Sequence, residues 1–194
     1  MVGIWNPFGA GKAQKQRALA LYRGLMAAAL APEAYAAGVV RDDMDHRVQM
    51  VSLHAGLLTW QLALRPEENL QRLPQLIHAR VFDGFDASLR ETGVGDASIA
   101  RKVRKLGEHH YGLGKALVEV LSGPGDNLVT ALSDLLKRNG VTNSGREGEL
   151  AHHLAALAEA LEEVPSEVFL AGAAAWPTFP ATSRRSVAKG SAAP

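Results

Sequence analysis

Apolar side chains recur at steps of three and four residues along most of this 194-residue chain. That spacing lines up one face of an α-helix, whereas a half-buried strand alternates apolar and polar residues at every second position. No β-type alternation occurs in the sequence. We therefore predict an all-α fold, and a chain of this length suits a single multi-helix bundle with short connections around one core.

Proline and glycine residues divide this pattern into segments. The first part predicts a helix over 11–31, a turn of helix at 33–37, a loop over 38–47 and a helix that ends near Arg65. The loop prediction rests on three aspartates and on the lack of an apolar period. Proline disfavours helical geometry in the residue before it, which is why we end the last of these helices before Pro66.

The second part predicts a helix that starts at Pro66, continues through a kink or restart at Pro74 and stops at Gly93. Three more helices follow, because the apolar period resumes three times after turn residues. Their expected N-terminal caps are Asp96, Asp126 and a capping box of Ser144 with Glu147.

After Trp176 the chain is rich in proline, serine and alanine. Such a composition does not support a packed core. We therefore expect one helical domain over 1–176 and a disordered basic tail over 177–194.

Composition excludes several classes of protein. The chain has no cysteine, so it contains no disulfide, no thiolate nucleophile and no zinc-thiolate site. Its longest apolar stretches, 51–64 and 168–176, are shorter than the roughly 20 residues that cross a bilayer. The start lacks the order of a secretory signal, and we expect no export.

The net charge of +1 is unevenly distributed. Residues before Glu33 carry +4 and residues from Pro177 onward carry +3, which leaves the middle of the chain at −6. An acidic body argues against a nucleic-acid-binding core, which needs a basic face. The basic ends are suited to anionic surfaces such as ribosomal RNA or lipid headgroups, although ordinary solvated termini explain them equally well.

Two glycine patterns resemble nucleotide-binding loops but lack the required context. The stretch 6–12 has asparagine where a phosphate loop needs its first glycine, and the segment around Gly93 and Gly95 follows a helix instead of a strand. The histidine pairs 109–110 and 152–153 consist of neighbours about 100° apart on a helix, so neither forms a ligand pair on one face. We predict no cofactor and no metal site.

His110 lies in an apolar stripe, which predicts a core histidine with one hydrogen-bond partner. His54 is the more promising functional histidine. No Ser-His-Asp order or carboxylate pair stands out, and we expect a protein that is not an enzyme.

The most informative segment is Phe82–Glu91, where acidic and basic side chains lie beside the apolar period. Asp86 and Arg90 are four residues apart and can pair on one helical face, with Asp83 one turn earlier. Arg101, Lys102, Arg104 and Lys105 give the following helix a basic face. The two charged faces can pair with each other or leave a charged groove for a partner, and the sequence favours pairing.

The segment 82–96 closely resembles the signature of the ubiquinol-cytochrome c chaperone family, with matching residues at Phe82, Asp83, Phe85, Asp86, Ser88–Glu91 and Gly93–Asp96. The resemblance extends over about 34–140 and includes Val103–Lys105, Tyr111–Gly112 and the approach to His54. The chain departs from it at His46, where glycine is expected, at Val48, where an aromatic residue is expected, and at His110, where phenylalanine is expected.

The resemblance implies an all-α, bacterial assembly chaperone that binds newly made cytochrome b and supports biogenesis of the ubiquinol-cytochrome c reductase complex. Within this resemblance we predict nine client-contact residues, and for each of them a role in folding is the alternative: Asp45, Arg47, His54, Asp83, Asp86, Arg90, Glu91, Asp96 and Lys105. We assign Gly93 and Gly95 to turn geometry, because a β-carbon is penalised where the backbone needs positive φ.

Mitochondrial relatives act near the ribosomal exit with a small partner protein, and the resemblance leaves open whether this chain has such a partner. We expect a cytoplasmic protein that is peripheral on the inner face of the membrane and contacts the ribosome or that membrane through its basic ends. The alternatives are a haem- or quinone-handling protein that uses His54 or His110, and a membrane-surface adaptor.

Overall fold

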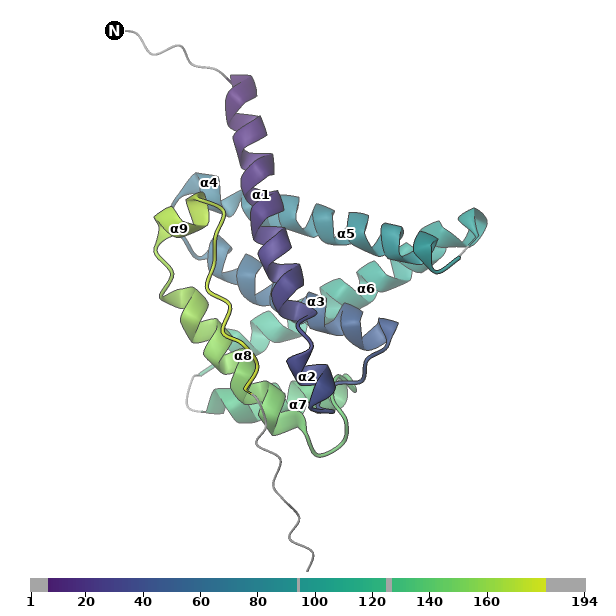
Figure 1. Ribbon diagram of the computed structural model, residues 1–194. Helices are drawn as coiled ribbons and strands as arrows, with labels where there is room; N and C mark the ends of the chain where they lie inside the picture. The colour runs from purple at the N-terminus through teal and green to yellow at the C-terminus, as the bar shows by residue number, and fades with distance from the viewer. Residues whose placement is uncertain (1–6, 94, 125–126, 181–194) are drawn as a thin grey trace, which may run out of the picture.

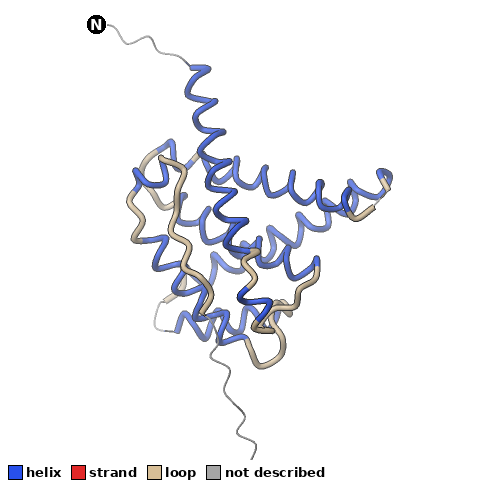
Figure 2. Tube along the Cα trace, viewed as in Figure 1, coloured by secondary structure: helices blue, strands red, loops and turns tan. Residues whose placement is uncertain are grey.

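The computed structural model describes residues 7–93, 95–124 and 127–180, and the regular elements in these ranges are all helices (Figures 1 and 2). The predicted all-α fold is therefore confirmed. None of the described helices is long and apolar enough to span a bilayer. The elements are α1 (Pro7–Ala29), α2 (Glu33–Ala36), α3 (Met44–Ala63), α4 (Glu68–Gln71), α5 (Leu73–Glu91), α6 (Asp96–Leu121), α7 (Leu128–Arg138), α8 (Glu147–Glu162) and α9 (Ser166–Leu170).

Helix α3 forms the centre of the core. Every residue from Val48 to Thr59 is buried, and α1, α5, α6 and α8 pack around the helix. A helix that is apolar on all sides belongs in the interior, and α3 has no wide polar face. The other long helices bury one stripe each, as Leu73, Ile77, Val81, Phe85 and Leu89 do in α5.

Helices α5 and α6 form an antiparallel hairpin whose tip projects from the body of the protein (Figure 1). The chain reverses at Gly93, which has a φ of +77° and so occupies a conformation that favours glycine. Gly95 lies in the same turn, as expected, but it does not need this freedom. Its φ is −64° and an added β-carbon meets nothing within 4 Å.

The C-terminal part returns along the surface of the bundle. After α9 an extended segment runs beside α8 (Figure 1), with Trp176 against Gly24 of α1 and the ring of Phe179 5.1 Å from that of His153. Phe179 is 7% exposed. Packed chain therefore continues beyond the boundary predicted at 176, because Phe179 is an aromatic anchor within the predicted tail; the rest of that tail, 181–194, lies outside the described residues.

Several predicted element ends differ from those observed. Helix α3 begins at Met44, inside the predicted loop, because the Asp43 carboxylate accepts a hydrogen bond from the backbone N–H of His46 at 3.0 Å. The His46 ring also bonds this carboxylate, at 2.6 Å, which gives the unexpected histidine a structural role.

The other predicted caps are also revised. Helix α6 starts at Asp96 with Gly95 as its N-cap, so Asp96 is the first helical residue and not the cap. The capping box of Ser144 does not form, because α8 starts after Arg146, whose guanidinium pairs with Glu149. Asp126 lies outside the described residues.

Glycines on α6 predict opposite effects of the same substitution. A β-carbon at Gly107 would lie 2.5 Å from Cε1 of Phe82 in α5, whereas one at Gly112 meets nothing within 4 Å. Gly112→Ala should stabilise the protein by up to about 1 kcal/mol through helix propensity. Gly107→Ala should lower the free energy of unfolding by roughly 1 kcal/mol, because overpacking of about 1–3 kcal/mol exceeds the same propensity gain.

Urea unfolding of both variants and the wild type measures these changes. Equal midpoints for Gly107→Ala and Gly112→Ala would show that α5 and α6 are not in close contact at Phe82.

Candidate functional site

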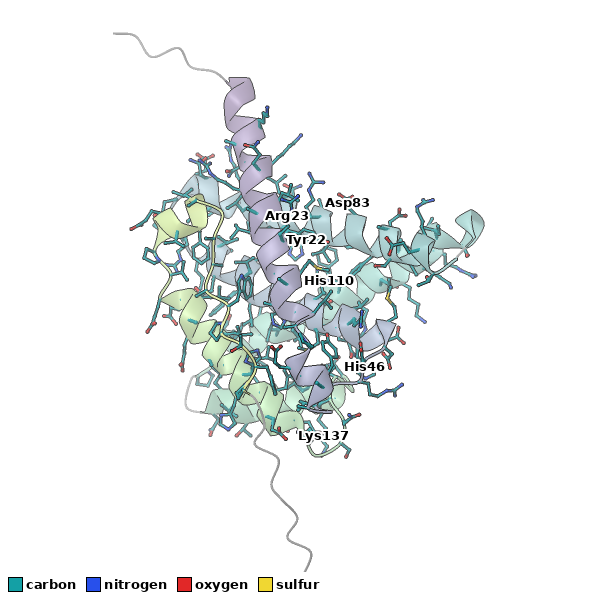
Figure 3. All side chains as sticks on the ribbon, in the orientation of Figure 1. Tyr22, Arg23, His46, Asp83, His110 and Lys137 are labelled. Carbon is teal, nitrogen blue, oxygen red and sulfur yellow. The ribbon has the colours of Figure 1, made fainter. Side chains whose placement is uncertain are left out.

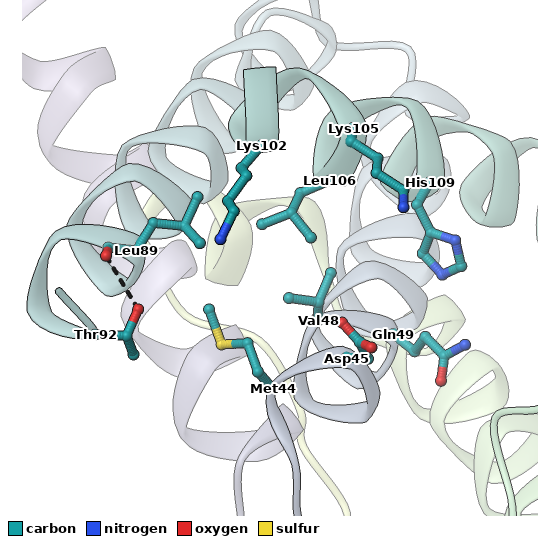
Figure 4. Close-up of a pocket in the computed structure, with 10 residues that line it drawn as sticks. All are labelled: Met44, Asp45, Val48, Gln49, Leu89, Thr92, Lys102, Lys105, Leu106 and His109. Carbon is teal, nitrogen blue, oxygen red and sulfur yellow. Dashed lines mark hydrogen bonds between the residues drawn. The ribbon is translucent and has the colours of Figure 1, made fainter. Parts of the chain in front are cut away.

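A groove opens where the start of α3 meets the hairpin of α5 and α6 (Figure 4). We call it the α3–α5–α6 groove, and its volume is about 620 Å³. This size lies within the range of ligand-binding clefts. Its lining residues are Met44, Asp45, Val48, Gln49, Leu89, Thr92, Lys102, Lys105, Leu106 and His109.

The groove has an apolar floor from all three helices. Met44 and Val48 lie one turn apart on α3, Leu89 lies near the end of α5, and Leu106 comes from α6 (Figure 4). Val48 and Leu89 are 4% and 7% exposed, so they also belong to the core. The N-cap of α3 fixes the position of this floor, because it determines where the first turn of the helix begins.

Charged side chains surround the floor. Lys102, Lys105 and His109 stand on α6, and Asp45 stands on the facing wall of α3 (Figure 4). Both lysines are exposed. Within the described part of the chain, neither of them has a carboxylate within 4 Å.

Four other cations on α5 and α6 have carboxylate partners on their own helix, whereas Arg101 of α6 has none among the described residues. These ion pairs are Arg80 with Asp83 at 3.3 Å, Arg90 with Asp86 at 2.7 Å, Arg104 with Glu108 at 3.7 Å and Lys115 with Glu119 at 3.9 Å. The predicted pairing of α5 acids with α6 bases is therefore wrong for Asp83 and Asp86, because both acids pair with arginines of their own helix. The lysines of the groove are left available to a partner.

Gln49 adds an unsatisfied polar atom to the wall of the groove. Its Nε2 donates to the carbonyl oxygen of Asn139 at 2.9 Å, whereas its buried Oε1 has no donor among the described residues. A buried acceptor without a donor costs free energy. This oxygen is buried, so it is not offered to a partner in the groove.

The groove brings together two of the nine predicted contact residues, Asp45 and Lys105. Asp86 and Arg90 line a separate pocket of about 430 Å³ with Ile99, Val103 and Arg104. Because Arg104 and Lys102 are two positions apart, they project about 200° from each other, and this second pocket lies on the other side of α6.

The other predicted residues are dispersed. Arg47 pairs with Asp42 at 2.6 Å, and Glu91 is exposed near the hairpin tip. Asp83 is near Tyr22 of α1 (Figure 3), and burial together with the Asp83 carboxylate raises the pKa of Tyr22. The side chain of Asp96 lies outside the described part.

His54 was predicted to contact the client, but the structure buries it. It is 1% exposed and its Nδ1 bonds the carbonyl oxygen of Met50 at 2.8 Å, so it is not available to a client. Its ring lies 6.0 Å from that of Trp176, in the segment that covers this side of α3. Sequence reasoning placed His54 at a site because it did not predict that α3 is buried on every side.

His110 is buried as predicted, but with two partners. Its Nδ1 lies 2.9 Å from Oγ of Ser52, and its Nε2 lies 2.9 Å from Nδ1 of His78. Since the Ser52 hydroxyl donates to the carbonyl oxygen of Val48, the serine oxygen accepts from His110, and His78 donates to His110. The serine proton is thus held by the backbone of α3, so this chain of bonds does not activate a nucleophile.

Burial lowers the pKa of both His54 and His110 from 6.5 to about 4, and a haem role through either ring is not supported by these contacts. The described residues contain no group of three histidine or acidic side chains placed to hold a metal ion. Sequence reasoning identified Lys102 only as part of a basic face. It missed Met44, Gln49 and Thr92, and only the three-helix arrangement identifies them.

The low pKa of buried His54 predicts a loss of stability in acid. The unfolded state takes up a proton near pH 6.5 and the folded state only near pH 4, so stability is full above pH 6.5 and falls as the pH drops towards 4. His54 alone should contribute about 3 kcal/mol to this fall between pH 7 and pH 4. His54→Leu should flatten the pH dependence of the free energy of unfolding, as measured by urea titration.

The exposed neighbour His152 supplies the matched control, and His152→Leu should retain the wild-type slope. If the free energy of unfolding has the same pH dependence in His54→Leu and His152→Leu, His54 is not the group that causes the loss of stability in acid.

Comparisons with known proteins agree with this architecture. The sequence profile described as ubiquinol-cytochrome C chaperone matches residues 36–176, which include all of the groove. Among solved structures, the chain is similar to one described as the Cbp3 homolog from Brucella abortus, with 28% sequence identity and a TM-score of 0.71, over 87% of this chain and 93% of that chain. No curated protein matches the sequence. The chain belongs to the ubiquinol-cytochrome c chaperone family.

Proposed function

We propose that this protein binds newly made cytochrome b and holds it during assembly of the ubiquinol-cytochrome c reductase complex. Membership of the chaperone family supports the role in assembly. The observation that carries the proposal of client binding is the α3–α5–α6 groove, which combines an apolar floor with a charged rim.

The client of such a chaperone is a membrane protein that is not yet surrounded by lipid. Its apolar segments lose free energy by leaving water, and they aggregate if no protein surface is available. The floor formed by Met44, Val48, Leu89 and Leu106 offers such a surface. The charged rim keeps the groove soluble when no client is bound, since an uninterrupted apolar patch would itself promote association.

The basic face of α1 is suited to bring the chaperone to the place of synthesis. Lys12 and Lys15 are exposed in the N-terminal half of α1, whose first part extends beyond the bundle (Figure 1), and no acidic residue lies in the first turn of α1. Polybasic segments are attracted to anionic lipid surfaces and to RNA. We therefore place the protein at the inner face of the membrane or at the ribosome during client capture.

Co-purification of cytochrome b with the tagged protein during active synthesis, in mild detergent, tests the proposal. The wild type should capture cytochrome b. Met44→Glu should lose capture, because it places a carboxylate on the floor of the groove. It should remain folded, because Met44 lies in the first turn of α3, where a negative charge is favourable.

Asp86→Lys is the control for the other side of α6, and it should retain capture. Capture that is lost with Asp86→Lys and kept with Met44→Glu would move the client surface to the pocket of Asp86 and Arg90. If the folded wild type captures no cytochrome b, the proposed client is wrong.

A further inference from the structure

We propose that the α3–α5–α6 groove selects client segments that carry a carboxylate beside their apolar face, and that Lys102 and Lys105 bind this carboxylate. This inference rests on the proposed function and specifies the chemistry of the segment. It reverses the simple expectation from net charge, in which an acidic body attracts the basic loops of a membrane protein.

The charges on the hairpin differ in whether they have partners. Arg80, Arg90, Arg104 and Lys115 each have a carboxylate on their own helix, whereas Lys102 and Lys105 have none within the described residues. The two lysines are also the ones that line the groove, beside Leu106. A carboxylate that arrives with an apolar segment would therefore meet two ammonium groups that need not first leave another partner.

The two walls of the groove carry opposite charges. Asp45 on the α3 wall faces Lys102 and Lys105 on the α6 wall (Figure 4), and no described cation lies within 4 Å of it. The dipole of α3 favours this carboxylate in the first turn of the helix. A bound segment would therefore be oriented with its negative group towards α6 and its N–H donors towards α3.

The α3 wall of the groove fits a polypeptide better than an anionic lipid. The α3 wall presents the carboxylate of Asp45, which is a hydrogen-bond acceptor. A polypeptide can supply N–H donors to such a wall, whereas a fatty acyl chain has none. The lining therefore fits an amphipathic segment of protein.

Fluorescence anisotropy with three synthetic amphipathic helical peptides tests the inference. The peptides share one apolar face and carry glutamate, glutamine or lysine at the same two positions beside it. Full-length wild type should bind the glutamate peptide about three- to tenfold more tightly than the glutamine peptide, and the lysine peptide most weakly, as expected for partly exposed ion pairs. The differences in affinity among the three peptides should become smaller at high salt, because salt screens the charges.

The double variant Lys102→Glu, Lys105→Glu should reverse this order. Arg101→Glu is the matched control, because Arg101 is an exposed neighbour on the same turn that does not line the groove, and it should keep the wild-type order. Equal affinities for the three peptides, or an unchanged order in the double variant, would overturn the inference. So would displacement of the glutamate peptide by phosphatidylglycerol vesicles but not by phosphatidylcholine vesicles, which would identify a lipid occupant.

This outcome is separable from that of the proposed function. If the wild type captures cytochrome b while the peptides bind without preference for charge, the proposed chaperone role is supported and the proposed selection by charge is wrong. If the peptides are discriminated but no cytochrome b is captured, the groove selects acidic segments of another client.

Discussion

The structure depends on the ability of α3 to be buried on every side. A buried helix must satisfy its polar side chains internally, and α3 does so against its own backbone. Ser52, His54 and Thr59 bond the carbonyl oxygens of Val48, Met50 and Ala55, each four residues earlier. These bonds allow four other helices to pack around α3, although Nε2 of His54 and Oε1 of Gln49 are buried without a partner among the described residues.

The groove is a consequence of this arrangement. The hairpin of α5 and α6 continues past the body of the bundle, so its tip and the first turn of α3 have fewer neighbours than the centre of the core (Figure 1). Leu89 and Leu106 extend the core stripe into this region, where Leu89 is still buried but Leu106 is only partly covered by the protein itself. An apolar floor at the edge of the bundle thus needs no special loop; it follows from helices of unequal length.

The sequence predicted the amphipathic parts of this fold well, because their period is visible in the residues themselves. The stripe of α5 from Leu73 to Leu89 was predicted as a helix and is observed as one. The start of α3 was missed because three aspartates conceal it, although one of them, Asp43, is the cap that begins the helix. The packed segment at Phe179 was missed because the prediction of a disordered tail relied on its proline, serine and alanine content and did not consider its single aromatic residue.

The candidate site was predictable only in part, for a physical reason. Sequence spacing shows which charges can pair within a helix, as Asp86 and Arg90 do, but it does not show which faces of two helices meet. The basic face of α6 was visible, yet the difference between Arg104 and Lys105 depends on the side of the helix from which each projects. Arg104 has Glu108 one turn away, whereas Lys105 faces the groove and Asp45 beyond it. The intrahelical pairs on one side of the hairpin thus leave Lys102 and Lys105, beside the apolar floor, without a carboxylate partner among the described residues. There, an incoming carboxylate changes the binding free energy more than it would on an open surface, because the surrounding apolar groups reduce solvent screening.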